Sequence, residues 1–381
     1  MSESPRTQPP GTLRLTKYQG AGNDFLVIVD LAGDHSLDPD EVRWLCDRHH
    51  GIGADGVMRV SPGGAAVGAR ASAGSPATAL SRASARSRAA VGGAALCMEL
   101  RNADGSVAEM SGNGIRCLVQ AAVDVGIVEP GSIGVSTAAG LRLVDYRVTG
   151  RASGFASVDM GEVSLGGTWD ASDDRWPRVG EAILPDAVPF LMARLASVGN
   201  PHLVVVLASR PDADVLYAHG PAIEKCLPGG TNLELVWPAV SAGSPLECGD
   251  LELVVWERGA GATLACGTGT CAAVAVVHDA GMCASDVRVR NPGGVLEVHL
   301  EPGEVGGQGS GPEVSPAYRA RLGGPSVRVG EIVAELPPAD ALRDQSLQGE
   351  LHTGDTRRTG DTRRTGDTRR TGDMRRTGGS R

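Results

Sequence analysis

The fold is decided by two stretches, SGNGIRCLVQAAVDVG at residues 111–126 and CGTGTCAAVAVVHDAG at residues 266–281. In each stretch a small residue and a Gly-x-Gly step precede an apolar run of helical length. A repeat of this length predicts two similar domains that face each other, with a ligand in the cleft between them. The stretches align at an offset of 155 residues, from Ser111 to Cys266. The identical positions there include Gly112 and Gly267, Gly114 and Gly269, Asp124 and Asp279, and Gly126 and Gly281.

The start of each predicted helix is suited to bind an anion. The first turn of a helix leaves N–H groups without partners, and together with the helix dipole these attract a carboxylate. The same field is expected to lower the pKa of the Cys266 thiol and so to provide a thiolate near neutral pH. A tight packing turn is the alternative interpretation of either stretch alone, and the paired occurrence favours a site.

Two helix starts that point at one carboxylate would place residues 111 and 266 on opposite sides of the adjoining carbon. One residue could then remove the α-proton while the other protonates the opposite face. The sequence therefore indicates a reaction that inverts a stereocentre.

The composition is that of a globular protein. Hydrophobic residues make up 41% and charged residues 21% of the 381 residues, and the net charge is -9. This charge disfavours a nucleic-acid partner. No window approaches the roughly 18 apolar residues of a membrane helix, and no signal segment is recognised, which predicts a cytoplasmic protein without a membrane partner. The eight cysteines contain no CxxC pair, so neither a disulfide scaffold nor a metal site is predicted.

Three segments differ in composition from the rest of the chain. We expect disorder at residues 1–11 and in the tail at 339–381, where TGDTRR begins at Thr353, Thr359 and Thr365. The stretch 61–95, rich in Ala, Gly, Ser and Arg, is predicted to be a mobile insertion. Between these segments short apolar runs alternate with glycine turns, which favours a mixed α/β fold, and six runs are predicted strands: 13–18, 25–30, 203–207, 232–237, 251–257 and 295–300.

Several motifs, in this order, resemble those of the diaminopimelate epimerase family, the cofactor-independent amino-acid racemases. The resemblance covers roughly residues 12–335. It rests on GAGNDF (20–25), RHHGIGADG (48–56), NADGSVAEMSGNGIR (102–116), GNPHLVVV (199–206), GTNLELV (230–236) and ERGAGATLACGTGT (257–270).

The resemblance implies a fold of two pseudo-symmetric domains, each a curved sheet around a central helix. The N-terminal half is expected at residues 12–152 and the C-terminal half at 153–322, with a strand at 323–338 that returns to the first half. In this family each half supplies one cysteine, and the pair interconverts LL- and meso-diaminopimelate without pyridoxal phosphate or metal. A cytoplasmic homodimer without a cofactor is therefore implied.

The resemblance also assigns site residues. Cys266 matches one catalytic thiol, and Ser111 stands at the position of the other. His202 and Glu257 are implied to modulate the pKa of the catalytic pair. Backbone donors to the α-carboxylate are implied at Gly112, Asn113, Gly267 and Thr268, and further substrate contacts at Asn23, Asn102, Asn200, Asn232, Glu257 and Arg258.

Two residues depart from the family pattern. Ser111 replaces a cysteine, and a serine hydroxyl is several pKa units less acidic than a thiol. Cys117 cannot take its place, because six residues of helix rise about 9 Å. Ala262 stands where the family has Glu, which removes an acidic group close to the N-terminus of the second helix.

These departures leave three hypotheses open. The chain is an epimerase in which Ser111 serves as a slow second acid, or a changed enzyme that works with one base as an eliminase or as a racemase of another amino acid. The third hypothesis is a non-catalytic amino-acid binder. A dinucleotide site at GIGADG is set aside in favour of a structural turn, because the glycines follow a polar stretch rather than a strand.

Overall fold

The computed structural model describes most of the chain between residues 12 and 338. The predictions of disorder at 1–11 and 339–381 fall almost wholly outside the described residues, and so does most of the predicted insertion at 61–95. Ser61 and Pro62 of that insertion belong to a strand, where they pair with Cys97 and Leu96. The described residues are 12–33, 35–63, 93–108, 110–169, 190–225, 227, 229–239, 250–303, 318–338 and 342.

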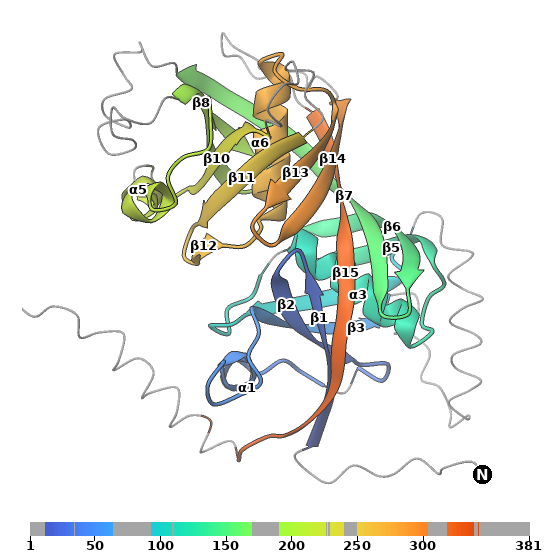
Figure 1. The fold of residues 1–381 in the computed structure, drawn as a ribbon. Helices are drawn as coiled ribbons and strands as arrows, with labels where there is room; N and C mark the ends of the chain where they lie inside the picture. The colour runs from blue at the N-terminus through green and yellow to red at the C-terminus, as the bar shows by residue number, and fades with distance from the viewer. Residues whose placement is uncertain are drawn as a thin grey trace, which may run out of the picture. The chain divides into compact units, whose positions relative to one another are not determined.

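The described chain holds two copies of one series of elements (Figure 1). The first copy consists of β1 (Thr12–Gly20), β2 (Asn23–Val29), α1 (Pro39–Cys46), β3 (Gly56–Pro62), β4 (Leu96–Asn102), α3 (Gly112–Asp124), β5 (Gly131–Thr137) and β6 (Gly140–Gly150). The second consists of β8 (Phe190–Ser197), β9 (Pro201–Leu207), α5 (Val215–Glu224), β10 (Asn232–Pro238), β11 (Asp250–Glu257), β12 (Gly261–Thr263), α6 (Gly267–Asp279), β13 (Asp286–Asn291) and β14 (Gly294–Pro302).

The strand pairings repeat as well. β2 and β3 are parallel, as are β9 and β10 at the same place in the second copy. The strands that flank the long helix are parallel in both copies, β4 with β5 and β11 with β13. The remaining strands of each copy pair antiparallel with their sequence neighbours, which is the pattern that short turns permit.

Two long strands, β7 (Ser153–Trp169) and β15 (Tyr318–Glu335), belong to both copies (Figure 1). They pair with each other, and β15 also pairs with β14 and with β1. β7 likewise pairs with β6 and with β8. The strands of each copy therefore close through the β7–β15 pair around one long helix, which confirms the predicted mixed α/β fold of two pseudo-symmetric halves.

The helices α3 and α6 form the centre of the two halves. Residues Gly112 to Ala122 of α3 are all buried, and α6 is buried along nearly its whole length. A helix that is buried on nearly every side needs protein all around it, and here strands surround each of the two helices. Replacing a fully buried valine such as Val276 by alanine would cost about 1–3 kcal/mol.

Each central helix ends on an aspartate that the surrounding sheet neutralises in the same way. Tyr18 donates a hydrogen bond to Asp124 at 3.0 Å, and Tyr318 donates one to Asp279 at 2.9 Å. An arginine also pairs with each carboxylate, Arg328 in the first half and Arg194 in the second. The helix dipole makes a carboxylate at a helix C-terminus unfavourable. In both halves the contacts from the tyrosine and the arginine offset this effect.

The GIGADG segment is a turn, as predicted. It follows α1 and leads directly into β3. A Cβ at Gly51 would lie 1.8 Å from the carbonyl oxygen of Trp44, so glycine is required for the chain to pass the end of α1. Among the helices that the structure describes, none combines the length and apolar character needed to cross a membrane.

Candidate active site

The N-termini of α3 and α6 meet, one from each half. A Cβ on Gly267 would lie 3.4 Å from the Cα atom of Gly112 and 2.9 Å from the side chain of Leu322. A Cβ on Gly112 would lie 3.0 Å from the same leucine. Glycine at the first position of each helix therefore permits the close approach that brings the two helix ends together, as the repeat predicted.

Ser111 and Cys266 cap these two helices with the same geometry. Both residues have extended backbone conformations, with φ and ψ of -135° and 120° for Ser111 and -117° and 119° for Cys266. The Ser111 hydroxyl accepts a hydrogen bond from the N–H of Gly114 at 3.0 Å, and Cys266 Sγ accepts one from Gly269 at 3.4 Å. Because each cap engages the third N–H of its helix, the N–H groups of the first two residues are left for a ligand.

Asn113 links the two halves at this junction. Its amide donates to the side chain of Asn23 and, at 3.1 Å, to the carbonyl oxygen of Ala265, which directly precedes Cys266. Asn23 is held in turn by Asp55, to which it donates a hydrogen bond of 3.0 Å. The predicted substrate residues Asn23 and Asn113 thus lie together, next to the residue that precedes Cys266.

Arg116 is fully buried behind the N-terminus of α3 and was not predicted. Its guanidinium donates to the carbonyl oxygen of Gly112 and to Asn113 Oδ1, both at 2.8 Å, and to the carbonyl oxygen of Pro325 at 3.4 Å. These acceptors are all uncharged, and burial lowers the pKa of Arg116 to about 10. The positive charge at this helix end is therefore uncompensated by any contact that the structure records.

The other helix end is surrounded by a hydrogen-bonded series of predicted residues. Cys266 Sγ lies 3.4 Å from Thr268 Oγ1, which accepts a hydrogen bond of 3.4 Å from Asn200. Asn200 Oδ1 lies 3.0 Å from Nε2 of His202, a fully buried side chain. The structure thus places His202 two side chains away from the thiol.

Two carboxyl groups lie near the Cys266 thiol. Glu257 accepts a hydrogen bond from the Thr263 hydroxyl, and burial raises its pKa. Glu234 is fully buried, and its Oε1 lies 2.7 Å from Nδ1 of His202. Glu234 was not predicted, although it follows Asn232 at the two-residue spacing that puts both side chains on one face of β10.

The environment of Cys266 corrects one expectation from the sequence. Burial raises the pKa of the thiol well above its usual value, and the charges of Glu257 and Glu234 raise it further. The hydrogen bonds from Thr268 and Gly269 act in the opposite direction. The field of the helix end was predicted to dominate, but it is outweighed by desolvation and by the carboxylates of β10 and β11.

Two of the predicted substrate residues support the loops around the site. Asn232 donates to the carbonyl oxygen of Pro201 at 3.1 Å and accepts a hydrogen bond of 2.8 Å from the backbone N–H of Arg258. The exposed Arg258 side chain donates to the carbonyl oxygen of Gly229 at 2.8 Å. Asn232 therefore fixes the segment that follows Glu257.

Asn102 differs from the other predicted residues. It is exposed at the end of β4, and its amide donates to Ser106 within its own loop at 3.0 Å. The structure shows no contact between this side chain and the helix ends. Its role in substrate binding stays a prediction.

The central helices contain two further cysteines. Cys117 and Cys271 are fully buried, and burial raises the pKa of both thiols to about 12. Among the described residues no group of three or more His, Cys, Asp and Glu side chains is arranged to hold a metal ion.

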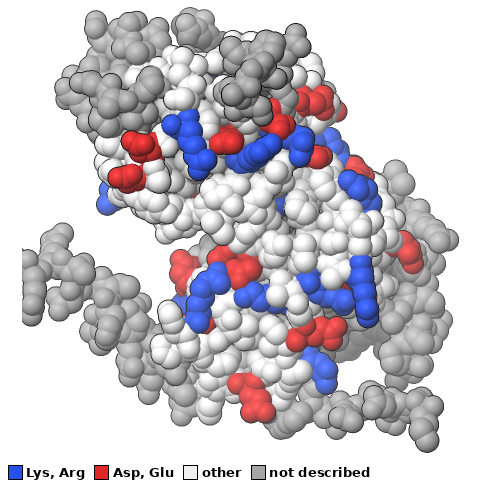
Figure 2. All heavy atoms as spheres, in the orientation of Figure 1, with Lys and Arg blue, Asp and Glu red and all other residues white. Residues whose placement is uncertain are grey.

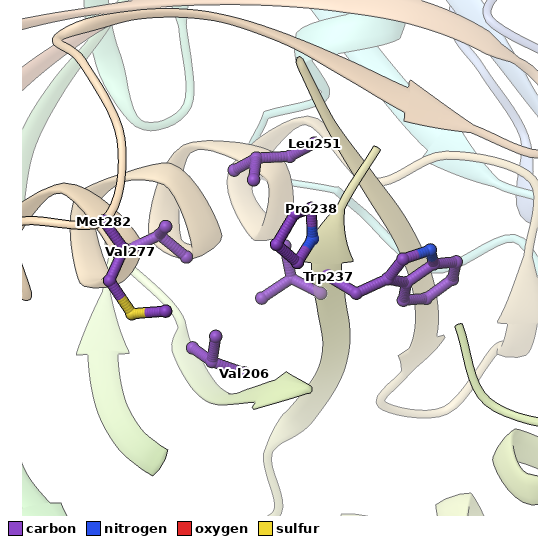
Figure 3. Close-up of a pocket in the computed structure, with 7 residues that line it drawn as sticks. Val206, Trp237, Pro238, Leu251, Val277 and Met282 are labelled. Atoms are coloured by element: carbon purple, nitrogen blue, oxygen red, sulfur yellow. The ribbon is translucent and has the colours of Figure 1, made fainter. Parts of the chain in front are cut away.

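An apolar pocket lies elsewhere in the second half (Figure 3). It is close to the C-terminal end of α6, roughly 16 Å of helix rise from Cys266. An amino acid needs polar groups to orient it, so this pocket does not fit the predicted ligand. Its lining consists of Val206, Val236, Trp237, Pro238, Leu251, Val277 and Met282.

The charged surface is mixed. On the face drawn in Figure 2, basic and acidic side chains of the described residues are interleaved over both halves. Ion pairs between β15 and its neighbours contribute to this pattern, for example Arg319 with Asp159 at 2.5 Å. A single-sign groove of the kind that tracks a nucleic-acid backbone is not visible on that face.

Comparison with known proteins identifies the family. The sequence profile described as diaminopimelate epimerase matches residues 15–166 and 194–306. A diaminopimelate epimerase from a Synechococcus strain is 37% identical over 298 residues, which cover 76% of this chain and 91% of the relative. Another, from Thermobifida fusca, is 36% identical over 326 residues, which cover 84% of this chain and 97% of the relative.

Solved structures share the fold at much lower sequence identity. A phenazine biosynthesis protein of the PhzF family from Bacillus anthracis has a TM-score of 0.54 at 13% identity, covering 85% of this chain and 99% of that chain. A probable proline racemase from Agrobacterium radiobacter has a TM-score of 0.52 at 16% identity, covering 86% of this chain and 94% of that chain. The profile match and the relatives together show that this chain belongs to the diaminopimelate epimerase family of isomerases.

Proposed function

We propose that the chain interconverts LL- and meso-diaminopimelate by cofactor-independent proton transfer at the α-carbon. The observation that carries this proposal is the meeting of two helix N-termini, where a Cβ on Gly267 would lie only 3.4 Å from the Cα atom of Gly112. Relatives that are 36–37% identical to this chain are named for this activity. The N–H groups at Gly112, Asn113, Gly267 and Thr268 would hold the α-carboxylate and stabilise the negative charge that develops on it.

Cys266 would perform the proton transfer on one face of the α-carbon. Its thiol first loses its proton to solvent, and the raised pKa of the thiol makes this step unfavourable near neutral pH. The thiolate then removes the α-proton, and the electron pair of the broken C–H bond moves onto the carboxylate group. A substrate ammonium group near Glu257 and Glu234 would offset their charges and so favour the thiolate.

Ser111 would act on the opposite face. The reaction inverts the centre when the planar intermediate takes a proton from that face, and it restores the original configuration when Cys266 returns the proton. A serine hydroxyl is a far weaker acid than a thiol, so we infer that inversion is slow and that return from Cys266 is the faster outcome. The serine at this position also favours a second candidate, one-base chemistry on this or another amino acid.

We further propose a division of the chain for this function. Residues 12–152 and 153–322 would form the two halves, with 323–338 returning to the first half. β7 begins at Ser153, directly after the proposed boundary. We also propose a homodimer in the cytoplasm, which light scattering of the purified chain and its fractionation in cells would test.

The activity is tested by incubating the purified protein with LL-diaminopimelate and separating the stereoisomers by chiral chromatography. The proposal predicts slow formation of meso-diaminopimelate, at a rate that is proportional to the protein concentration. A protein that binds the amino acid in calorimetry but forms no meso isomer over many hours would contradict epimerase activity and favour the one-base alternative.

A further inference from the structure

The Glu234 carboxylate occupies an unusual position. Both it and its neighbour His202 are fully buried, and only one of its oxygens, Oε1, has a hydrogen-bond partner among the described residues. Leaving a buried charged oxygen without a donor is unfavourable and calls for a functional explanation.

This carboxylate lies against the N-terminal turn of α6. A Cβ on Gly269 would lie 2.4 Å from Glu234 Oε1, so only glycine admits the side chain there. Gly269 is also the residue whose N–H donates to Cys266 Sγ at 3.4 Å. The geometry thus brings a carboxyl group against the turn that holds the thiol.

Glu234 is also the last member of a hydrogen-bonded series that begins at the thiol. Sγ of Cys266 contacts Thr268, which accepts from Asn200. Asn200 contacts Nε2 of His202, and Nδ1 of the same ring contacts Glu234. With an oxygen facing each ring nitrogen, the orientation of the imidazole is fixed.

We propose that Glu234 is a positioning residue that orients His202 and keeps Cys266 as a neutral thiol in the resting protein. This inference rests on the proposed function and deepens it, because it assigns how the acid form of the catalytic cysteine is maintained. Burial and the charges of Glu257 and Glu234 all raise the pKa of Cys266, which agrees with the geometry.

The groups that face the start of α6 come from several elements. β9, β10 and β11 contribute His202, Glu234 and Glu257, and the adjoining end of α3 contributes Ser111 and the buried Arg116. β7 and β15 contribute the apolar Met160 and Leu322. Arg194 of β8 pairs with Asp279 at the opposite end of α6, and β14 contributes buried apolar side chains, among them Leu296, Val298 and Leu300.

The test is the pH dependence of Cys266 alkylation in the full-length protein. Iodoacetamide is applied without substrate between pH 6 and 10, and modification of the peptide that contains Cys266 is followed by mass spectrometry. In Glu234→Gln the midpoint of the curve of Cys266 alkylation rate against pH should move to lower pH. Alkylation near pH 7.5 should then be faster by on the order of tenfold. An unchanged or higher midpoint would overturn the proposal.

Glu252→Gln is the matched control. Glu252 also lies in the sheet of the second half, where its carboxylate accepts a hydrogen bond of 3.0 Å from Trp237. It lies five residues before Glu257 in β11, which is about 17 Å along the strand. The midpoint of Cys266 alkylation in Glu252→Gln should equal that of the unmodified protein. The midpoint in Glu234→Asp, which keeps the carboxyl group, should remain close to the same value. A shift as large in Glu252→Gln as in Glu234→Gln would overturn the assignment to position 234.

A second measurement covers the case in which Glu234→Gln does not fold. Thiolate absorbance near 240 nm, taken as the difference between the unmodified protein and Cys266→Ser, should appear only above pH 9. A difference signal at pH 7 would overturn the proposal. Neither readout needs turnover, so a protein that passes these tests and fails to form meso-diaminopimelate would contradict the proposed function alone.

Discussion

The N-termini of α3 and α6 are built on one plan and differ in charge. At the offset of 155 residues, Arg116 corresponds to Cys271, and Asn102 corresponds to Glu257. The first helix end therefore has a buried guanidinium, while the second has two carboxyl groups and His202 near its capping thiol. The two halves therefore share the scaffold of a capped helix N-terminus, whereas the carboxyl groups and the imidazole lie at only one of the two helix ends.

This comparison predicts its largest effect for the second helix end. Cys266→Ser should abolish exchange of the substrate α-proton with solvent, because no other described group near the junction can form a nucleophilic thiolate. The measurement is deuterium incorporation by mass spectrometry. Ser111→Ala is the matched control, and it should retain most of the exchange. Surviving exchange in Cys266→Ser would contradict the assigned chemistry.

Restoring a thiol at the first helix end is the next strongest test. Ser111→Cys should raise the rate of LL-to-meso conversion by roughly 10²- to 10⁴-fold, the range typical of a well-placed general acid or base. Its thiol would lie near the buried charge of Arg116 and near the helix dipole, both of which favour the thiolate. If chiral chromatography shows an unchanged rate, Ser111 is not the limiting defect.

The buried guanidinium of Arg116 is present at only one of the two helix ends, and its contribution to stability can be measured. Arg116→Met removes the donor to Gly112, Asn113 and Pro325, so it should lower the free energy of unfolding by about 2–4 kcal/mol. Urea denaturation followed by circular dichroism measures the change. Arg288→Met, at an exposed position of β13, should alter the free energy by less than about 0.5 kcal/mol. Equal changes in the free energy of unfolding in the two variants would show that the hydrogen bonds of Arg116 do not stabilise the fold.

The raised pKa of Cys266 predicts a pH dependence. Below the pKa of the thiol, the thiolate fraction and the exchange rate should rise about tenfold per pH unit. Initial exchange rates between pH 6.5 and 8.5 at saturating substrate test this slope. A rate that is flat over this range would mean that the thiol is already ionised in the complex.

The smallest effects concern the opposite ends of the two helices. Tyr18→Phe and Tyr318→Phe each remove one hydrogen bond to the terminal aspartate, so each should destabilise the protein by about 1 kcal/mol. Thermal unfolding of the two variants compares them directly. A loss that is several times larger in one half would show that the two contacts are not equivalent.

The sequence predicted the fold better than it predicted the chemistry. The repeated Gly-x-Gly stretches placed both central helices, because the pattern is local and the burial of an apolar helix follows from it. Most of the predicted site residues also lie around the helix junction, Asn102 excepted. The positions of Arg116 and Glu234 could not be anticipated, because an arginine in a helix and an alternating strand residue are ordinarily exposed.

The direction of the pKa shift of Cys266 was wrong for a related reason. A helix N-terminus is visible in the sequence, whereas desolvation depends on side chains from β10 and β11 that come near only in the folded protein. The extent of burial decides between these opposing effects, and it is a property of the tertiary structure.

The central claim is that Cys266 is the principal acid–base group of the site and that Ser111 is at most a slow second acid. It is tested most directly by incubating LL- and meso-diaminopimelate separately in D₂O and comparing the initial rates of α-deuterium incorporation and of inversion. The account predicts that deuterium enters one of the two configurations faster, with retention, and that inversion lags behind exchange. Equal exchange from both configurations, with inversion at the same rate, would contradict it.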